Sequence, residues 1–193
     1  MRVLNYLELA GRLGRSGIGT AVENQRKALA DGEHDILTSP WAGGSLTTAG
    51  LKRAVGEPLF ASHDLAHCNL IGPGTLAVAE HAKRNGIPLV LHAHVTREDF
   101  AGSFRGSTAV GPALERYLRW FYSRADLVLC PSAYTKAVLS SYPIEAPIRS
   151  ITNGVDIEAL KGYEELRGPY RRRFDLDGLV VFAVGNVFER KGV

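Results

Sequence analysis

The sequence alternates short apolar runs, typical of β-strands, with longer segments of helical periodicity. Several of the apolar runs have no polar side, which is typical of a parallel sheet covered by helices on both faces. Strands are expected at 3–7, 35–38, 65–71, 89–92, 127–130, 148–152 and 179–184, and helices at 18–30, 75–85, 112–124 and 133–141. This alternation predicts right-handed βαβ units and therefore an α/β fold with a doubly wound parallel sheet.

Length and composition are those of a globular protein. The chain has 193 residues, of which 45% are apolar and 22% charged, and no apolar run approaches the ~20 residues of a membrane-spanning helix. A formal net charge of +3 suits a surface that meets phosphates or anionic lipid, and it does not indicate nucleic acid. Cys68 and Cys130 lie in apolar runs, so buried free thiols in a reducing cytoplasm are expected, and no Cys/His spacing indicates zinc.

The C-terminal part indicates one complete domain followed by the beginning of another. A polar, arginine-rich stretch follows Asp156, and the apolar run 179–184 then leads into a charged glycine turn. The expected organisation is a first domain at 1–156, an interdomain segment at 157–177 and the start of a truncated second domain, with its first strand, at 178–193. The Asp-x-Asp triplet at 175–177 precedes a strand, so a solvated turn is expected there.

Three glycines, Gly14, Gly17 and Gly19, follow the first expected strand and lead into a helix. Ligands of doubly wound sheets bind beyond the carboxyl ends of the strands, and free N–H groups at a helix start favour a phosphate or a polar sugar edge. The spacing is not the GxGxxG fingerprint, and no Walker lysine follows. A flexible connection between strand and helix is therefore the alternative interpretation.

Two histidines, His92 and His94, share one side of an extended segment. His94 lies where the strand ends, and an imidazole there can hydrogen-bond a sugar hydroxyl or stabilise charge that develops in a transition state. The alternative for His94 is a core histidine that bonds to the backbone, and this is the expected role of His92, one step further inside. Metal binding would need a third ligand, which the sequence does not show.

Two basic segments carry further candidates. In the segment 114–124, an apolar stripe leaves Arg116, Arg119 and Trp120 on the opposite side, a combination that suits contact with a membrane interface. The alternative is an ordinary surface helix whose tryptophan packs under a loop. In the terminal turn, Arg190 and Lys191 suit a diphosphate leaving group, and the alternative there is an ordinary charged turn.

Taken together, these segments resemble the N-terminal half of retaining, nucleotide-sugar-dependent glycosyltransferases of the GT-B fold, similar to glycosyltransferase family 4. The matching pieces are, in order, GRSGIGTAVENQRKALA, DLAHCNLIGPGTLAVAEHAKRNGIPLVLHAH, RADLVLCPSAYTKAVL, ITNGVD and VGNVFERKG. The pieces HAHVTREDFAGSF, GPALERYLRWFYSRADLVLCPSAYTK and SYPIEAPIRSITNGVD look like diacylglycerol glucosyltransferases in particular.

The resemblance implies two Rossmann-like domains that face each other across a cleft, with the acceptor bound by the N-terminal domain. By match to the family's motifs, His94 corresponds to the active-site histidine, Gly17 and Gly19 to the loop beside the donor phosphates, and Arg190 and Lys191 to the basic pair that steadies the leaving diphosphate. Asn186 follows Gly185 where many members have arginine, which makes the basic pair more important for that role.

The expected function is that of the acceptor-side half of a retaining glycosyltransferase. The resemblance implies a UDP- or GDP-linked nucleotide sugar as donor, a lipid such as diacylglycerol or a glycan as acceptor, and no cofactor or bound metal. A cytoplasmic protein, peripheral at the inner face of the membrane, is expected. The fragment alone is expected to be inactive, because the second domain should supply most donor contacts and close the cleft. The alternatives are a non-catalytic nucleotide- or sugar-binding module and an enzyme of the same class that acts on a soluble sugar or glycan.

Overall fold

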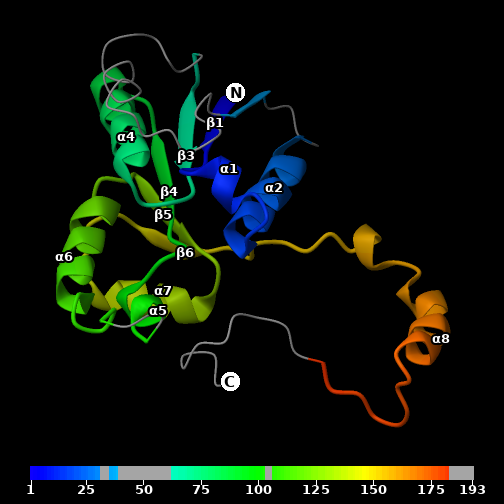
Figure 1. Ribbon diagram of the computed structural model, residues 1–193. Coiled ribbons are helices and arrows are strands. Elements are labelled where there is room, and N and C mark those ends of the chain that lie inside the picture. The colour runs from blue at the N-terminus through cyan, green and yellow to red at the C-terminus, as the bar shows by residue number, and fades with distance from the viewer. Residues whose placement is uncertain (31–34, 39–61, 103–105, 183–193) are drawn as a thin grey trace. The chain divides into compact units, whose positions relative to one another are not determined.

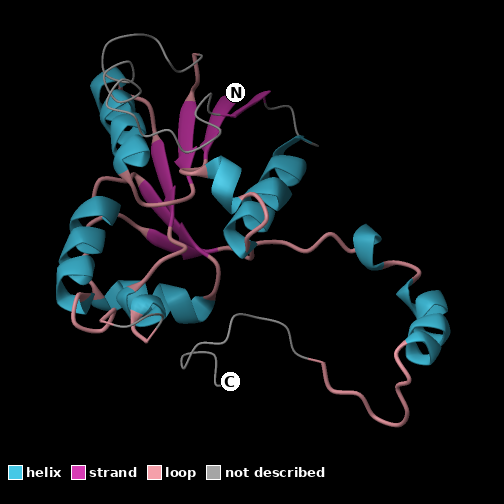
Figure 2. Ribbon diagram, viewed as in Figure 1, coloured by secondary structure: helices cyan, strands magenta, loops and turns pink. Residues whose placement is uncertain are grey.

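The structure is a computed structural model that describes residues 1–30, 35–38, 62–102 and 106–182. The chain divides into two compact units, Met1–Gly154 and Val155–Val193. The first unit contains a six-stranded sheet in the order β2-β1-β3-β4-β5-β6, in which every neighbouring pair is parallel (Figure 2). The strands are β1 (Arg2–Tyr6), β2 (Asp35–Thr38), β3 (Leu65–Cys68), β4 (Leu89–His92), β5 (Leu127–Cys130) and β6 (Ile148–Ser150). The predicted doubly wound parallel sheet is therefore confirmed.

The long helices of the first unit lie on both sides of the sheet (Figure 1). Helix α2 (Gly17–Ala30) connects β1 to β2 on one face, while α4 (Pro73–Asn85), α6 (Gly111–Tyr122) and α7 (Ala133–Ser141) connect the strands from β3 to β6 on the other. Right-handed crossovers require this division, because the strand order runs in opposite directions from β1. Two short helices, α1 (Ala10–Leu13) and α5 (Arg97–Phe100), complete the described part of the unit.

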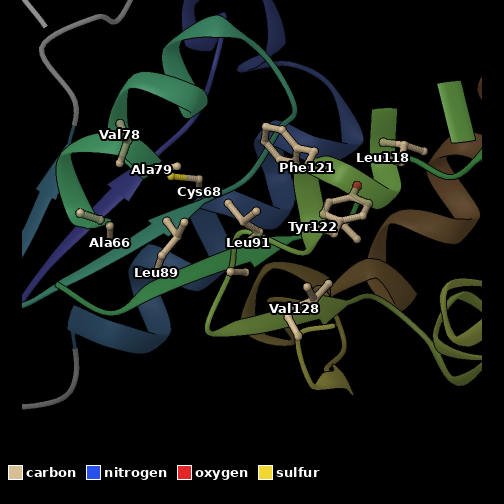
Figure 3. Close-up of a cluster of buried hydrophobic side chains, with 14 of the residues drawn as sticks. Ala66, Cys68, Val78, Ala79, Leu89, Leu91, Leu118, Phe121, Tyr122 and Val128 are labelled. Atoms are coloured by element: carbon tan, nitrogen blue, oxygen red, sulfur yellow. The ribbon is translucent and has the colours of Figure 1, made fainter. Parts of the chain in front are cut away.

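The apolar core fills the space between the sheet and the helices α4, α6 and α7. Figure 3 shows Leu89, Leu91 and Val128 of the strands beneath Phe121 and Tyr122 of α6. The predicted stripe of α6 is confirmed, because its residues either are buried or pack against this core. Cys68 and Cys130 are both buried free thiols, as predicted.

The opposite face of the sheet is polar toward the carboxyl ends of the strands. Side chains alternate between the two faces of a strand, so the residues next to the core positions point toward the side of α2. In β1, Asn5 lies between the core residues Leu4 and Tyr6, and in β3, His67 lies between Ala66 and Cys68. Asn5 and His67 are nevertheless buried. The candidate site is therefore built on this face.

Several expectations about local structure need correction. The segment expected as a loop after β1 begins with helix α1, and α5 was not expected at all. The signal for α5 was the pair Thr96 and Asp99, because Thr96 Oγ1 accepts a hydrogen bond from the Asp99 amide over 3.1 Å and caps the helix.

The second unit contains a 3-10 helix η1 (Glu158–Leu160) and helix α8 (Tyr163–Arg173), neither of which is among the predicted helices. Acidic residues in the first turn of α8 and arginines in its last turn complement the helix dipole, and the helix contains Pro169 in its interior. The strand expected at 179–184 is not found in its described part, 179–182, where no described strand of this unit offers a partner; 183–184 lie outside the described residues. The Asp-x-Asp triplet is an exposed turn region, as expected.

Candidate active site

The loop before α2 is held by side-chain and backbone hydrogen bonds. Ser16 Oγ donates to the Leu13 carbonyl over 2.7 Å and accepts from the Gly19 amide over 3.2 Å, so it caps α2. A Cβ atom at Gly19 would lie 2.2 Å from the Leu13 carbonyl oxygen, which gives this glycine a packing role between α1 and α2. A Cβ at Gly17 would meet no atom within 4 Å. The start of α2 is thus open at Gly17, as a helix end that receives an anion has to be.

Histidines in and just after β4 form a stack on the polar face of the sheet, near His67 of β3. The rings of His92 and His94 are almost parallel, with an interplanar angle of 4° and centroids 4.3 Å apart. The ring of His67 in β3 is also close to that of His92, with centroids 5.7 Å apart and an angle of 19°. His94 is two residues beyond the end of β4, and so it lies at the carboxyl edge of the sheet, as predicted.

All three rings are held in the neutral form by their surroundings. Burial, which penalises the charged imidazolium, lowers the pKa of His94 to about 4. Burial and the charges of His94 and His67 lower the pKa of His92 to about 3, and burial together with His94 lowers the pKa of His67 to about 4. In the neutral state, each ring offers one N–H donor and one acceptor nitrogen. The buried Nε2 atoms of all three have no hydrogen-bond partner in the described part of the chain.

Helix α2 contacts this stack through Gln25. Its Nε2 atom lies 3.0 Å from Nδ1 of His92. His92 is buried, as expected, but its partner is this side chain rather than the backbone. The preceding residue, Asn24, donates through Nδ2 to the carbonyl oxygens of Asn153 and Gly154, over 3.2 and 2.9 Å. Helix α2 therefore joins the histidine stack and the end of the first unit.

The sequence did not identify Gln25, nor did it identify Glu8. The Glu8 carboxylate is almost fully buried and accepts hydrogen bonds from the backbone amides of Gly74 and Thr75 at the start of α4. Both residues contact partners more than sixty positions away in the chain. No local pattern signals such a contact, and the only clue was the position of Glu8 just after β1.

The exposed face of α6 lies outside the histidine stack and carries Arg116, Arg119 and Trp120. All three line a groove of about 770 Å³, together with Arg97 of α5 and residues that follow α7. Trp120 is 48% exposed, and the guanidinium of Arg124 lies 4.7 Å from its ring centroid, so it does not pack under a loop. Neither Arg116 nor Arg119 has an ion-pair partner among the described residues.

Three further points concern the terminal basic pair, metal binding and membrane-spanning helices. Arg190 and Lys191, with Gly185 and Asn186, lie outside the described residues. Within the described ranges, no group of three or more His, Cys, Asp or Glu side chains is arranged to hold a metal ion. None of the helices in those ranges combines the length and the apolar character that a bilayer crossing requires.

Comparison with known proteins places this geometry in a family. The model of Glycosyltransferase Family 4 matches residues 49–159, which is more than half of the chain. This chain belongs to Glycosyltransferase Family 4. The match to the family includes β3 to β6, and therefore the histidine stack and α6, whereas Gly17, Gly19 and Gln25 precede it.

A curated relative extends the similarity over the whole chain. The chain is 29% identical, over 196 aligned positions, to a "Processive diacylglycerol alpha-glucosyltransferase" of Acholeplasma laidlawii. The alignment covers 100% of this chain and 52% of the relative. This member of Glycosyltransferase Family 4 thus spans about half the length of the curated relative that it matches.

Proposed function

We propose that this chain is the acceptor-side part of a retaining glycosyltransferase that moves a sugar from a nucleotide sugar to a membrane lipid such as diacylglycerol. Membership of Glycosyltransferase Family 4 supports glycosyl transfer, and the name of the curated relative supports the lipid acceptor. The observation that carries the proposal is the partly buried, neutral imidazole of His94 at the carboxyl edge of the sheet.

A neutral His94 suits a reaction in which positive charge develops on the transferred sugar. The neutral ring donates or accepts a hydrogen bond to a sugar hydroxyl without placing a second positive charge beside an oxocarbenium-like transition state. Glycosidic cleavage transfers the bonding electrons to the diphosphate, whose oxygen then takes the proton of the attacking acceptor hydroxyl. No carboxylate nucleophile is required of this chain, and Glu8 is already fully engaged as a helix cap.

The start of α2 is the proposed contact for the donor phosphates. The helix dipole and the amides of its first turn favour an anion, and Gly17 leaves them open to approach. Gly19 has the different role of allowing α1 and α2 to pack together. Arg190 and Lys191 are proposed to stabilise the leaving diphosphate, as the resemblance implies. The donor is proposed to be UDP- or GDP-linked, and no cofactor or metal is part of the proposal.

The exposed face of α6 is the proposed contact with an anionic membrane at its cytoplasmic side. Arg97 is neutralised by Glu115, whose carboxylate lies 2.6 Å from it, which leaves Arg116 and Arg119 as the cations of this groove that form no ion pair with any described residue. Arginines near an anionic leaflet and a half-exposed tryptophan are the side chains that a membrane interface selects. A lipid acceptor would be reached from that surface.

The test is a screen of nucleotide sugars and acceptors with the full-length enzyme, its His94→Ala variant and, as a matched control, His81→Ala on α4. We expect transfer to diacylglycerol, with kcat lowered roughly 100-fold by His94→Ala and KM changed little, because a contact made in the transition state affects kcat. His81→Ala should behave as wild type. Unchanged kcat in a folded His94→Ala variant would assign His94 a structural role. Transfer to soluble sugars alone would replace the lipid acceptor, and binding without transfer would indicate a non-catalytic module.

A further inference from the structure

A continuous line of contacts leads from helix α2 to His94. Gln25 Nε2 lies 3.0 Å from Nδ1 of His92, and the ring of His92 lies flat against that of His94. His92 is the last residue of β4, whereas His94 lies beyond its end, where the backbone is no longer part of the sheet. The ring of His94 therefore stacks on the ring of a residue whose backbone is fixed in the sheet.

The contact with Gln25 determines which nitrogen of His92 carries the proton. With the Gln25 amide oriented so that Nε2 faces Nδ1 of His92, its N–H group donates, Nδ1 accepts, and the proton of the neutral ring is on Nε2. The same hydrogen bond prevents rotation of the ring about its own axis. With Gln25 absent, nothing else among the described residues holds Nδ1, and both tautomers and several ring orientations become accessible.

Through the stack, the orientation of the His92 ring affects that of His94. Two neutral, almost parallel rings with centroids 4.3 Å apart are in van der Waals contact in an offset stack. A tilt of His92 would open that contact or push the ring of His94 aside. The ring of His67 is a further neighbour of His92, with centroids 5.7 Å apart. The orientation of His94 thus depends on the ring beneath it.

We propose that Gln25 and His92 are positioning residues that fix the ring of His94, Gln25 through its hydrogen bond to His92 and His92 through the stack. This inference rests on the proposed function, because it takes His94 as the residue that contacts the transferred sugar. Helix α2 then has two roles, since it offers its first turn to the donor phosphates and orients the imidazole through its middle.

The kinetic test compares Gln25→Leu in two versions of the full-length enzyme, one with His94 and one with His94→Ala. In the enzyme with His94, we expect kcat to fall roughly 10-fold with little change in KM, because small displacements of a catalytic group are costly. In the His94→Ala background, Gln25→Leu should change kcat less than about 2-fold, since the residue acts only through His94. Glu23→Gln, an exposed substitution on the same helix, is the matched control and should leave kcat unchanged. Equal losses in both backgrounds would overturn the inference.

A second measurement is independent of catalysis. Nitrogen-15 spectra of histidine-labelled full-length protein report the tautomer of each imidazole. We expect His92 as the Nε2–H tautomer in the wild type, and Gln25→Leu should mix its tautomers and shift the signals of His94. His92→Phe keeps a flat ring under His94, so it should shift those signals less than His92→Ala does. If Gln25→Leu leaves the His94 signals unchanged, the inference is wrong even where transfer is measured. If they shift and no sugar is transferred by the wild type, the proposed function fails while the coupling stands.

Discussion

Replacing Glu8 should destabilise the first unit more than any exposed acidic substitution. Its carboxylate is only 2% exposed and accepts from the Gly74 amide over 3.2 Å and from the Thr75 amide over 2.9 Å. Tyr6 donates its hydroxyl to the same carboxylate over 3.3 Å. The residue before α4 is Gly72, which has no side chain to cap the helix, so Glu8 supplies the cap from another part of the chain.

The magnitude follows from the groups that Glu8→Ala leaves behind. Two buried backbone N–H groups lose their acceptor, and each unsatisfied buried donor costs about 1–3 kcal/mol. Part of that cost disappears where the first turn of α4 relaxes toward water, so we expect the free energy of unfolding to fall by about 3 kcal/mol. In Glu8→Gln, one oxygen still accepts, while the new NH₂ group faces the amide donors, and a loss of about 1.5 kcal/mol is expected.

The assay is urea unfolding at neutral pH, followed by circular dichroism, with a thermal scan as a second measure. For a chain of this length, about 3 kcal/mol corresponds to a decrease in Tm of roughly 6–12 °C. Glu80→Gln is the matched control, because Glu80 forms exposed ion pairs with Arg84 and Arg124. Its effect should stay within about 0.5 kcal/mol. If Glu8→Ala and Glu80→Gln shift the urea midpoint equally, the buried cap does not stabilise α4 and the reasoning is refuted.

Two further predictions concern the histidines and the membrane. The pKa of His67 is about 4 in the folded chain and near 6.5 in the unfolded chain. Between these pH values the unfolded state binds a proton that the folded state does not bind. The contribution of His67 to the free energy of unfolding is therefore complete above about pH 6.5 and is lost as the pH falls toward 4. Urea unfolding at pH 7 and 5 should therefore show a steeper loss in the wild type than in His67→Phe, by up to about 1.4 kcal/mol per pH unit, and equal slopes would mean that His67 titrates normally. The full-length protein should bind vesicles that contain phosphatidylglycerol weakly and less so in added salt, since each arginine contributes only ~1 kcal/mol. Replacing Arg116, Arg119 and Trp120 together should weaken binding without unfolding the protein, whereas the control pair Lys83→Gln and Arg84→Gln on α4 should not; equal binding by all three proteins would exclude α6 as the contact.

The elements that the sequence predicted are those whose signal is local. Alternating apolar runs identified the strands β1 to β6, and a stripe of period 3.6 identified α6 with its buried Phe121 and Tyr122. Ser132, a residue type that favours the position just before a helix, caps α7, and its Oγ accepts from the Thr135 amide. Such features depend on residues a few positions apart, so one chain segment is enough to find them.

The elements that the sequence missed depend on distant partners or on competing signals. Helix α8 is not among the predicted helices, and it contains Pro169, a residue that disfavours a helix interior. In the sequence, nothing distinguishes Gln25 from the other polar residues of α2, because its contact with His92 spans 67 positions of the chain. For His92, burial was predicted from its place inside a strand, but the identity of its partner depended on how α2 crosses the sheet.

The two faces of the sheet explain why the candidate site lies where it does. On the side of α4 and α6, the strands present side chains such as Leu4, Leu91 and Val128, which need no hydrogen bonds and pack densely. On the side of α2, the same strands bury imidazole nitrogens that have no partner among the described residues, at a cost in stability that an apolar side chain would avoid. Packing is therefore favourable on the face toward α4 and α6, whereas the face toward α2 buries polar groups without partners. Such unfavourable arrangements concentrate at functional sites, which points to function on the α2 face. The histidine stack is such an arrangement, and it lies at the strand ends where doubly wound sheets bind their ligands.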